Sequence, residues 1–507
     1  MMASAKAQSA SFTLGAAACL EGPSSGIGSV VLAATPSTAT WSATNNATWL
    51  HLNAANQNGT GSTNVIFSYD ANPGATRAGT IRIAGQTFTV NQAGSTYVAT
   101  ADVTALAVPG SSDGIAVDGE GNVYMADYNY NDVLKWTLTN NSVSTVISSG
   151  VLGTPGAIVP ISVAVDAVGD VYYADYDASL IVEVSAANRS VTAIVSSGLL
   201  DPGGVAVDGT GNIYIADTGH NEVKKWSATD NAVTTLVSSG LNDPTAVALD
   251  TAGNVYIADT DNIAIKEWNA ADDTVTLLTS SGFWYPYGVA VDTAGNVYIA
   301  DTFSNAIKEW TVANDTVVTL VSNGLSYPMG VAVDGAGNVY FNDGVVFELP
   351  RAFVDPTPRS YSCAPGSDAL PVVLPTNANL LPPFAPSSDA PWLTITGVTN
   401  GVVSFTLATN SGPIRGAYIT LLGQPIEVLQ ASPPNFLNPT AFSNSTFQFA
   451  FSNFQNSSFT VLSTTNLMLP VSSWTLVGTA SNIAPDYYQF TDTQASGPQR
   501  FYRVRSP

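Results

Sequence analysis

The sequence is poor in the residues that many catalytic and metal sites use. It has two cysteines and two histidines in 507 residues, and only 10% of its residues are charged. Two cysteines exclude a disulfide framework. Two histidines provide little for a metal centre, because such centres need several converging ligands. No apolar run approaches the roughly 20 residues that a membrane-spanning helix needs, so we expect no membrane span.

Positive charge is also scarce. The chain has 15 basic and 38 acidic residues, which gives a formal net charge of −23. A surface this acidic repels phosphate backbones and anionic lipid, so nucleic acid is not an expected partner. Short β-branched and aromatic runs alternate with Gly, Asn, Asp and Pro, a pattern that predicts an all-β fold.

What the chain has in abundance is an internal repeat of the form GVAVD-xx-GNVYIAD. The spacing of its first aspartate is 48 residues once and 42 residues four times. A four-stranded antiparallel unit of about 42 residues is typical of a propeller blade, so the copies predict six blades. The first aspartate recurs at Asp118, Asp166, Asp208, Asp250, Asp292 and Asp334, and a second at Asp127, Asp175, Asp217, Asp259, Asp301 and Asp343.

The sequence also predicts how the ring closes. The sixth unit ends at "VYFNDGVVFELP" without a fourth strand, whereas "ADVTALAVPG" (101–110) precedes the first unit and is similar to "NAVTTLVSSG" of the third. We expect this N-terminal strand to complete the last blade, which would leave no open sheet edge. The repeats resemble the NHL-repeat family of six-bladed propellers, over about half of the chain.

Three segments flank the repeats. Residues 10–96 contain "TWSATNNATWLHL" and "NPGATRAGTIRIAGQTFTVNQAG" and resemble the BACON domain, a sandwich of secreted bacterial proteins for which carbohydrate binding has been suggested. A second copy repeats the fifteen-residue spacing of Arg77 and Gln92 at Arg415 and Gln430, but has no counterpart of Trp41. Residues 433–507 resemble the short C-terminal sandwich of secreted proteins from Verrucomicrobia-like bacteria, which implies export or surface display.

These observations predict five parts and an extracellular or cell-surface location. The predicted parts are a flexible leader (1–9), a BACON-like sandwich (10–96), the propeller (97–356), a degenerate BACON-like sandwich (357–432) and a C-terminal sandwich (433–507), the sandwiches being small and Ig-like. Cys19 and Cys363 lie at equivalent positions of the two BACON-like segments. They are either two buried thiols or a bridge between domains.

Catalytic residues are not apparent. The resemblance to propeller lyases implies several histidines around a metal, but His51 lies in the first sandwich and His220 stands alone in a loop. Lactonase-like propellers place carboxylates and Asn at the start of the first strands, where this chain has Gly114, Ser162, Gly204, Ala246, Gly288 and Gly330. The repeated aspartates occur in every unit, so we expect them to cap backbone N–H groups in turns. We therefore predict no catalytic residue, no metal and no cofactor.

Functional residues are expected where one unit departs from the others on an exposed loop. In the fifth unit "FWYP" stands where other units have "LLDP", "LNDP" and "LSYP". Phe283 matches a leucine in three of these loops and is expected to pack between blades. The ligand-binding candidates on this loop face are Trp284, Tyr285, Tyr287, Phe303, Tyr327, Tyr128, Tyr130 and Tyr176, with Asn242, Asp243 and His220.

Aromatic rings can stack on a sugar or grip a peptide, while Asn and Asp accept hydroxyl protons. The sequence thus favours a non-catalytic extracellular protein that binds a glycan or a protein through the loop face. Two alternatives stay open. One is a structural subunit of a filament or surface layer that self-associates through its sandwiches, and the other is a divergent propeller lyase or lactonase.

Overall fold

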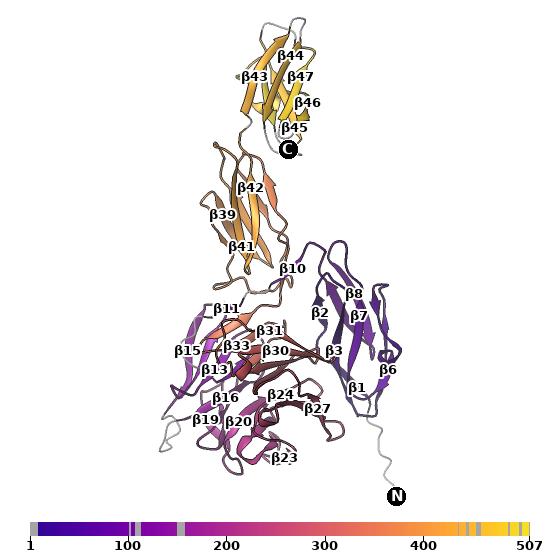
Figure 1. Ribbon diagram of the computed structural model, residues 1–507, viewed down its shortest axis with the longest axis vertical. Coiled ribbons are helices and arrows are strands. Elements are labelled where there is room, and N and C mark those ends of the chain that lie inside the picture. The colour runs from indigo at the N-terminus through magenta and orange to yellow at the C-terminus, as the bar shows by residue number, and fades with distance from the viewer. Residues whose placement is uncertain are drawn as a thin grey trace. The chain divides into compact units, whose positions relative to one another are not determined.

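The computed structural model describes residues 9–100, 103–106, 113–149, 158–433, 435–442, 446–452, 458–484, 487–495 and 499–505. The chain forms two compact units (Figure 1). The first is Met1–Phe353 with Asn377–Ala385, and the second is Val354–Thr376 with Pro386–Pro507. Regular structure is almost entirely β. The helices of the described residues are single 3₁₀ turns, none long and apolar enough to cross a membrane: η1 (Ala54–Asn56), η2 (Thr218–His220), η3 (Thr260–Asn262), η4 (Thr302–Ser304) and η5 (Val471–Ser473).

The N-terminal segment of the first unit folds into two sheets that share one apolar core. Leu32, Val65 and Phe67 contribute to this core from one sheet, and Ile81 and Phe88 contribute from the other. One sheet has the order β1 (Ser11–Leu14), β3 (Gly26–Thr35), β7 (Thr63–Tyr69), β5 (Leu50–His51), and the other has the order β2 (Ala18–Glu21), β9 (Gln86–Gln92), β8 (Arg77–Ile83), β4 (Thr40–Asn45), β6 (Asn58–Thr60).

The repeats form six four-stranded antiparallel sheets in the described residues, numbered here 1 to 6. In chain order, sheets 1 to 3 are β12 (Gly114–Val117), β13 (Val123–Asp127), β14 (Asp132–Thr137), β15 (Ser142–Ser148); β16 (Pro160–Val165), β17 (Val171–Asp175), β18 (Leu180–Val184), β19 (Val191–Val195); and β20 (Pro202–Val207), β21 (Ile213–Asp217), β22 (Glu222–Trp226), β23 (Val233–Val237). Sheets 4 and 5 are β24 (Pro244–Leu249), β25 (Val255–Asp259), β26 (Ala264–Trp268), β27 (Val275–Thr279); and β28 (Pro286–Val291), β29 (Val297–Asp301), β30 (Ala306–Thr311), β31 (Thr316–Val321).

Sheet 6 combines both ends of the repeat region. It has the order β11 (Thr104–Ala105), β34 (Val346–Leu349), β33 (Val339–Asn342), β32 (Val331–Val333). Thr104 pairs with Glu348 and Ala105 with Phe347. The expected N-terminal strand is therefore confirmed for its described part, while residues 101–102 and 107–110 of that segment lie outside the described residues. The short strands β10 (Val98–Ala99) and β35 (Phe353–Val354) pair with each other.

The six sheets fit a β-propeller. Each first strand lies against the first strand of the next sheet, and β32 lies against β12. Apolar side chains fill the spaces between neighbouring sheets; for example, Tyr214 and Val223 of sheet 3 share a core with Val255 and Ile257 of sheet 4. One sheet cannot cover both of its faces, so stacking around the ring supplies the core.

The first repeated aspartate does what the sequence predicts. Asp208 Oδ1 accepts hydrogen bonds from the N–H groups of Thr210 (2.9 Å) and Asn212 (3.0 Å). Its Oδ2 accepts from the Asn212 amide (2.8 Å) and the Tyr214 hydroxyl (3.4 Å). Because the aspartates of the other sheets make the same turn contacts, this set is structural.

The second unit contains the second copy of the duplicated motif. In each copy an arginine Nε donates to a glutamine Oε1 at 2.9 Å, from Arg77 to Gln92 and from Arg415 to Gln430. In each, the guanidinium lies 4.3 Å from the centre of a tryptophan ring, Trp49 or Trp392. The shared spacing therefore reflects one repeated structural device.

The remaining strands all lie in the second unit. One pair of sheets has the orders β36 (Arg359–Tyr361), β42 (Gln424–Gln430), β41 (Arg415–Leu421), β38 (Ser387–Ser388) and β37 (Gly366–Ala369), β40 (Val402–Leu407), β39 (Leu393–Thr399). A C-terminal sheet has the order β43 (Asn435–Phe442), β44 (Thr446–Ser452), β47 (Tyr487–Asp492), β46 (Thr475–Ala484), β45 (Phe459–Thr464), β48 (Phe501–Arg505). Cys19 and Cys363 are both free thiols, so the structure contains no bridge between them.

Candidate functional site

The second repeated aspartate positions the loops that link one sheet to the next. Its carboxylate accepts the N–H of a loop residue: Asp217 from Leu200 (2.7 Å), Asp259 from Asn242 (2.7 Å), Asp301 from Trp284 (2.8 Å) and Asp343 from Ser326 (2.6 Å). A charged acceptor strengthens such bonds. These carboxylates therefore fix the loops that carry the candidates Trp284, Tyr285, Tyr327, Asn242 and Asp243.

In sheets 3, 4 and 5 a lysine on the third strand completes this arrangement. Lys224, Lys266 and Lys308 pair with Asp217, Asp259 and Asp301, and each Nζ also donates to a glycine carbonyl of the same loop. In sheets 1, 2 and 6 the equivalent register positions are Leu134, Val182 and Phe347. Without a lysine there, burial raises the pKa of Asp127, Asp175 and Asp343.

A threonine makes a further contact in the same three sheets. Thr218, Thr260 and Thr302 directly follow the second aspartate, and each hydroxyl donates to a proline carbonyl in the next linking loop, at 2.7–2.8 Å. Sheets 1 and 2 have Tyr128 and Tyr176 at this position. Tyr128 and Tyr176 therefore replace a threonine that, in sheets 3 to 5, hydrogen-bonds to the next linking loop.

The "FWYP" loop has an unusual backbone conformation at its third residue. Tyr285 has φ = +82°, and Asp201, Asp243 and Tyr327 at the equivalent positions also have positive φ. Asp tolerates the left-handed region better than a bulky aromatic residue does. Because strain of this kind is concentrated at functional sites, the tyrosine at this position supports a role beyond folding.

Five of the candidate aromatic residues form one cluster, named here the aromatic cluster. Phe303 is at its centre. The Tyr285 ring stacks on Phe303 with centroids 4.5 Å apart, and Trp284 and Tyr327 meet Phe303 edge-on at 6.0 and 5.9 Å. Tyr287 stacks on Tyr285 at 6.5 Å. Trp284 is 64% exposed and Tyr327 is 57% exposed, which confirms the expected exposure of the tryptophan. Phe283 instead packs in the core between sheets 4 and 5, as predicted.

A β-bulge places Tyr287 at the start of its strand. The pairing of β28 with β29 shifts register between Pro286 and Gly288, and Tyr287 is the extra residue. The same register shift occurs in the first strands of sheets 2, 3 and 4, so the bulge is a feature of the repeat and not of Tyr287 alone. Burial, followed by the charges of Asp113 and Asp243, raises the pKa of Tyr287.

Asp113 is the functional candidate that sequence analysis missed. It lies five residues before the first repeated aspartate, the position of Tyr287 in sheet 5. Burial and the charge of Asp127 raise the pKa of Asp113 to about 6. A comparison of this position across the repeats could have found it, because the other sheets have Ile161, Gly203, Thr245, Tyr287 and Met329 there and Asp113 is the one acid.

The remaining candidates fall into two groups. Burial raises the pKa of Tyr176, and the charges of Asp201, Asp243, Asp177 and Tyr128 raise it further. The charge of Tyr176 in turn contributes to the raised pKa of Tyr287. Asp243 adjoins the aromatic cluster, because its Oδ2 accepts a hydrogen bond from the Tyr285 hydroxyl at 3.4 Å. Tyr130 and Asn242 are exposed, and among the described residues neither side chain contacts that cluster.

His220 differs from the expectation of an isolated loop histidine. Its Nδ1 lies 2.8 Å from Asp217 Oδ2, the carboxylate that also binds Lys224. In sheet 4 the Asn262 amide makes the equivalent contact with Asp259 at 2.8 Å. An asparagine can replace the histidine in this contact, so it is a loop contact and does not indicate a histidine-specific reaction.

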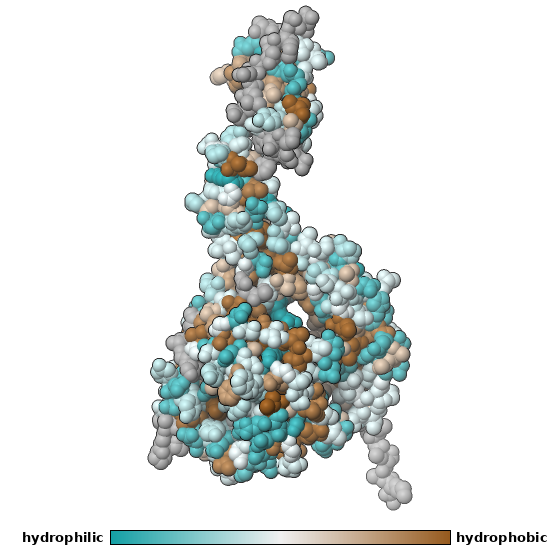
Figure 2. Space-filling model, in the orientation of Figure 1, coloured by the Kyte–Doolittle hydropathy of each residue, from teal (hydrophilic) through white to brown (hydrophobic). Residues whose placement is uncertain are grey.

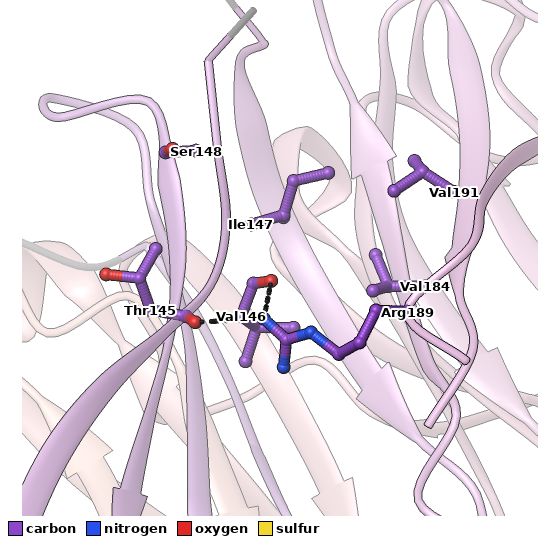
Figure 3. A pocket seen from close by; sticks show the side chains of 7 residues that line it. All are labelled: Thr145, Val146, Ile147, Ser148, Val184, Arg189 and Val191. Atoms are coloured by element: carbon purple, nitrogen blue, oxygen red, sulfur yellow. Dashed lines mark hydrogen bonds between the residues drawn. The ribbon is translucent and has the colours of Figure 1, made fainter. Parts of the chain in front are cut away.

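A cleft of about 340 Å³ lies elsewhere, between sheets 1 and 2. Figure 3 shows the Arg189 side chain reaching along it, and the guanidinium donates to the carbonyls of Thr145 (3.3 Å) and Val146 (2.9 Å). The other lining residues are Ile147, Ser148, Val184 and Val191. The one charged group of this cleft, the Arg189 guanidinium, already donates to backbone carbonyls. The cleft therefore has fewer groups available to bind a ligand than the aromatic cluster.

Exposed apolar residues alone do not identify a site in this protein. On the face shown in Figure 2, hydrophobic residues of the first unit lie in patches among hydrophilic ones. Scattered exposure of this kind is normal. In the described parts of the chain, no three His, Cys, Asp or Glu side chains come together in a way that could hold a metal ion.

Comparison with protein families matches two parts of the chain. Residues 39–93 match the BACON family, described as "Putative binding domain, N-terminal", and residues 199–226 match the NHL repeat. The second match covers much of sheet 3 and agrees with the ring of four-stranded sheets. The six sheets fit a β-propeller, and one of them contains a segment that matches an NHL repeat. No curated protein sequence matches the chain significantly.

Solved structures similar to this chain include proteins with different activities. One is a gluconolactonase from Xanthomonas campestris, with 14% identity, a TM-score of 0.42, and coverage of 49% of this chain and 89% of that chain. Another is virginiamycin B lyase from Staphylococcus aureus, with 14% identity, a TM-score of 0.38, and coverage of 49% and 82%. A third is a Bacteroides thetaiotaomicron protein of unknown function, with 15% identity, a TM-score of 0.42, and coverage of 68% and 98%.

Proposed function

We propose that the chain is a non-catalytic extracellular binding protein that holds a glycan or protein ligand on the loop face of its propeller. The observation that carries this proposal is the aromatic cluster. Five rings from the linking loops and η4 contact one another, and two of them are largely exposed. Grouped aromatic side chains with nearby polar groups are the usual composition of a binding surface.

We further propose that the six sheets are six blades, closed by the N-terminal strand, and that the flanking segments are β-sandwich domains. This arrangement gives the loop face a rigid scaffold, since the linking loops before sheets 3 to 6 are each held by a carboxylate of the sheet that follows. The BACON-like segment suggests export and a ligand at the cell surface.

The proposal is tested with the full chain on glycan and peptide arrays, comparing wild type with Trp284→Ser. Serine stands at the equivalent place before sheet 6, at Ser326. We expect a ligand found with wild type to bind about 5- to 150-fold more weakly to the variant, equivalent to about 1–3 kcal/mol for one lost aromatic contact. Stability should change by no more than about 0.5 kcal/mol, as for other surface substitutions.

Leu277→Ser provides the matched control. Leu277 is 58% exposed on β27 and is not part of a linking loop. This variant loses an exposed apolar side chain from the same propeller and should bind like wild type. Equal binding by wild type and Trp284→Ser would contradict the proposal, as would equal losses in both variants.

A further inference from the structure

The loop between β45 and β46 of the C-terminal sheet presents a run of exposed apolar side chains. Met468 is 90% exposed, Leu467 is 58% exposed, and Leu469 is exposed as well. The loop is held in this conformation by its own residues. The Met468 N–H donates to Asn466 Oδ1 at 3.0 Å, and Trp474 Nε1 donates to Leu469 O at 3.2 Å. Apolar groups that are exposed and already fixed in place are typical of a binding surface.

Two arginines lie on a face of the sheet beside this loop. Leu462 of β45 pairs with Arg503 of β48 on one side and with Leu476 of β46 on the other. Directly paired residues of antiparallel strands share one face, so this face carries an arginine and the exposed Leu476 together. Arg505 lies two residues beyond Arg503 and points to the same face. Neither guanidinium has a hydrogen bond or an ion pair among the described residues.

These residues are named here the C-terminal surface: Leu467, Met468, Leu469, Leu476, Arg503 and Arg505. Their part of the chain differs from the rest in charge, since no charged residue occurs between Glu427 and Asp486. Residues 433–507 contain two acidic and three basic residues, whereas residues 97–356 contain 31 acidic and 7 basic residues. The formal net charges of these two segments, +1 and −24, are therefore complementary.

The loop face of the propeller offers groups that match the C-terminal surface. Trp284 and Tyr327 of the aromatic cluster are largely exposed. Asp243 adjoins this cluster, because its Oδ2 accepts a hydrogen bond from the Tyr285 hydroxyl at 3.4 Å. Asp261 is exposed, and its N–H donates at 3.2 Å to a carbonyl of the linking loop that contains Asp243. Aromatic rings beside carboxylates can bind an apolar loop beside arginines.

Resting on the function proposed above, we infer that the protein ligand of the loop face is the C-terminal surface of a second copy of this chain. The apolar loop packs on the exposed rings of the aromatic cluster, and the two arginines pair with carboxylates of the loop face. Because the two surfaces differ, a bound pair of copies still has one of each free. Such a contact joins copies head to tail and produces a ring or a filament.

Sedimentation velocity of the full chain tests this inference. We expect wild type to form dimers and larger species as the protein concentration rises through the micromolar range, which ordinary interfaces reach. Leu467→Ser with Met468→Ser should weaken the association at least about fivefold, and so should Trp284→Ser, because each removes an anchor of one surface. All three side chains are exposed, so these variants should fold like wild type.

A mixture of these two variants gives the most specific result. The Trp284→Ser protein keeps an intact C-terminal surface, and the Leu467→Ser, Met468→Ser protein keeps an intact loop face. Each alone should stay monomeric at a concentration where wild type associates, whereas together they should form a dimer and nothing larger. An interface that uses the same surface on both copies would not give this result.

The arginines are tested through the effect of salt. Arg503→Gln with Arg505→Gln should weaken the association and make it less dependent on ionic strength, because salt screens charge pairs across an interface. The matched control is Ile414→Ser with Tyr418→Ser, which removes two exposed side chains from the second unit outside the C-terminal sheet. The control should associate like wild type.

Four results would overturn the inference. They are a wild type that stays monomeric at every concentration, a mixture that forms no dimer, an equal loss in the control variant, and association of Trp284→Ser like that of wild type. If monomeric wild type binds phosphatidylglycerol vesicles and the Leu467→Ser, Met468→Ser protein does not, a lipid surface covers the C-terminal surface instead.

Failure of the inference is distinguishable from failure of the proposed function. A glycan or peptide that binds wild type but not Trp284→Ser, with no self-association of wild type, would leave the loop face as the binding surface and show that its ligand is not a second copy.

Discussion

At the scale of single residues, the two repeated aspartates have different tasks although the sequence presents them alike. The first closes a turn within its own sheet. The second holds the loop that links two sheets, and a lysine supports it in only half of the ring. Sheets 6, 1 and 2, which are neighbours in the ring, lack both this lysine and the threonine that joins adjacent loops.

We predict that Lys308→Leu destabilises the protein by about 3–5 kcal/mol, the usual cost of removing one partner of a buried ion pair. Leucine is the residue at the equivalent position of sheet 1, Leu134, and Asp301 is fully buried. The free energy of unfolding, measured in urea, provides the check. Adding Asp301→Asn should recover part of the loss, because the buried charge is then absent. A loss below about 0.5 kcal/mol would show that this pair contributes nothing measurable.

At the scale of elements, the sequence predicts most strands because each one alternates or repeats in step with its copies. It also predicts β11, because the sequence around β11 is similar to the fourth strand of the third unit. It does not predict the bulge in the first strands of sheets 2 to 5, because a bulge depends on the register with the neighbouring strand, which the pattern of one strand does not specify. The Asp301–Lys308 pair joins adjacent strands, and its only sequence signal is a lysine repeated in three units.

The same reasoning explains why the candidate site was only partly predicted. Trp284, Tyr285 and Phe303 stand out as departures from the repeat, and the structure brings them together. Asp113 also departs from the repeat, as the one acid at its position, so a comparison of that position in all six units could have found it too.

The closing strand provides a prediction at this scale. Removing residues 1–110 should lower the melting temperature by at least about 5 °C relative to removing residues 1–94. The larger deletion removes β11 and Leu106, which is 3% exposed and whose N–H donates to Val346 O at 2.8 Å. Losing one such buried side chain alone costs about 2–5 kcal/mol. At this domain size, each 1 kcal/mol corresponds to about 2–4 °C.

Thermal melts followed by circular dichroism check this expectation. Both truncated proteins lack the N-terminal sheets, so their difference isolates residues 95–110. Identical melting temperatures would contradict the role of β11 in holding sheet 6 together.

At the scale of the whole molecule, the acidity of the chain extends into its interior. On third strands, burial and nearby aspartates raise the pKa of Glu267 to about 7 and of Glu348 to about 8. Glu348 is 1% exposed, and its Oε2 has no partner among the described residues. Between their ordinary pKa of 4.5 and these raised values, such acids are ionised in the unfolded chain and take up a proton on folding, so stability should fall as pH rises through this range.

We predict that Glu348→Gln raises stability at high pH and not at low pH. A carboxyl whose pKa is higher in the folded state contributes no penalty below its ordinary pKa of 4.5. The penalty grows as pH rises toward about 8, where the folded protein must bury the charge. Melting temperatures of wild type and variant should therefore coincide near pH 4. They should diverge as pH rises above about 4.5, and the difference should level off near pH 8, where glutamine gains about 1–3 kcal/mol by removing an unpaired buried acceptor charge. Glu120→Gln, at an exposed turn residue, controls for the change in net charge and should follow wild type at every pH. A constant offset between Glu348→Gln and wild type from pH 4 to pH 9 would mean that packing, and not the buried proton, distinguishes them.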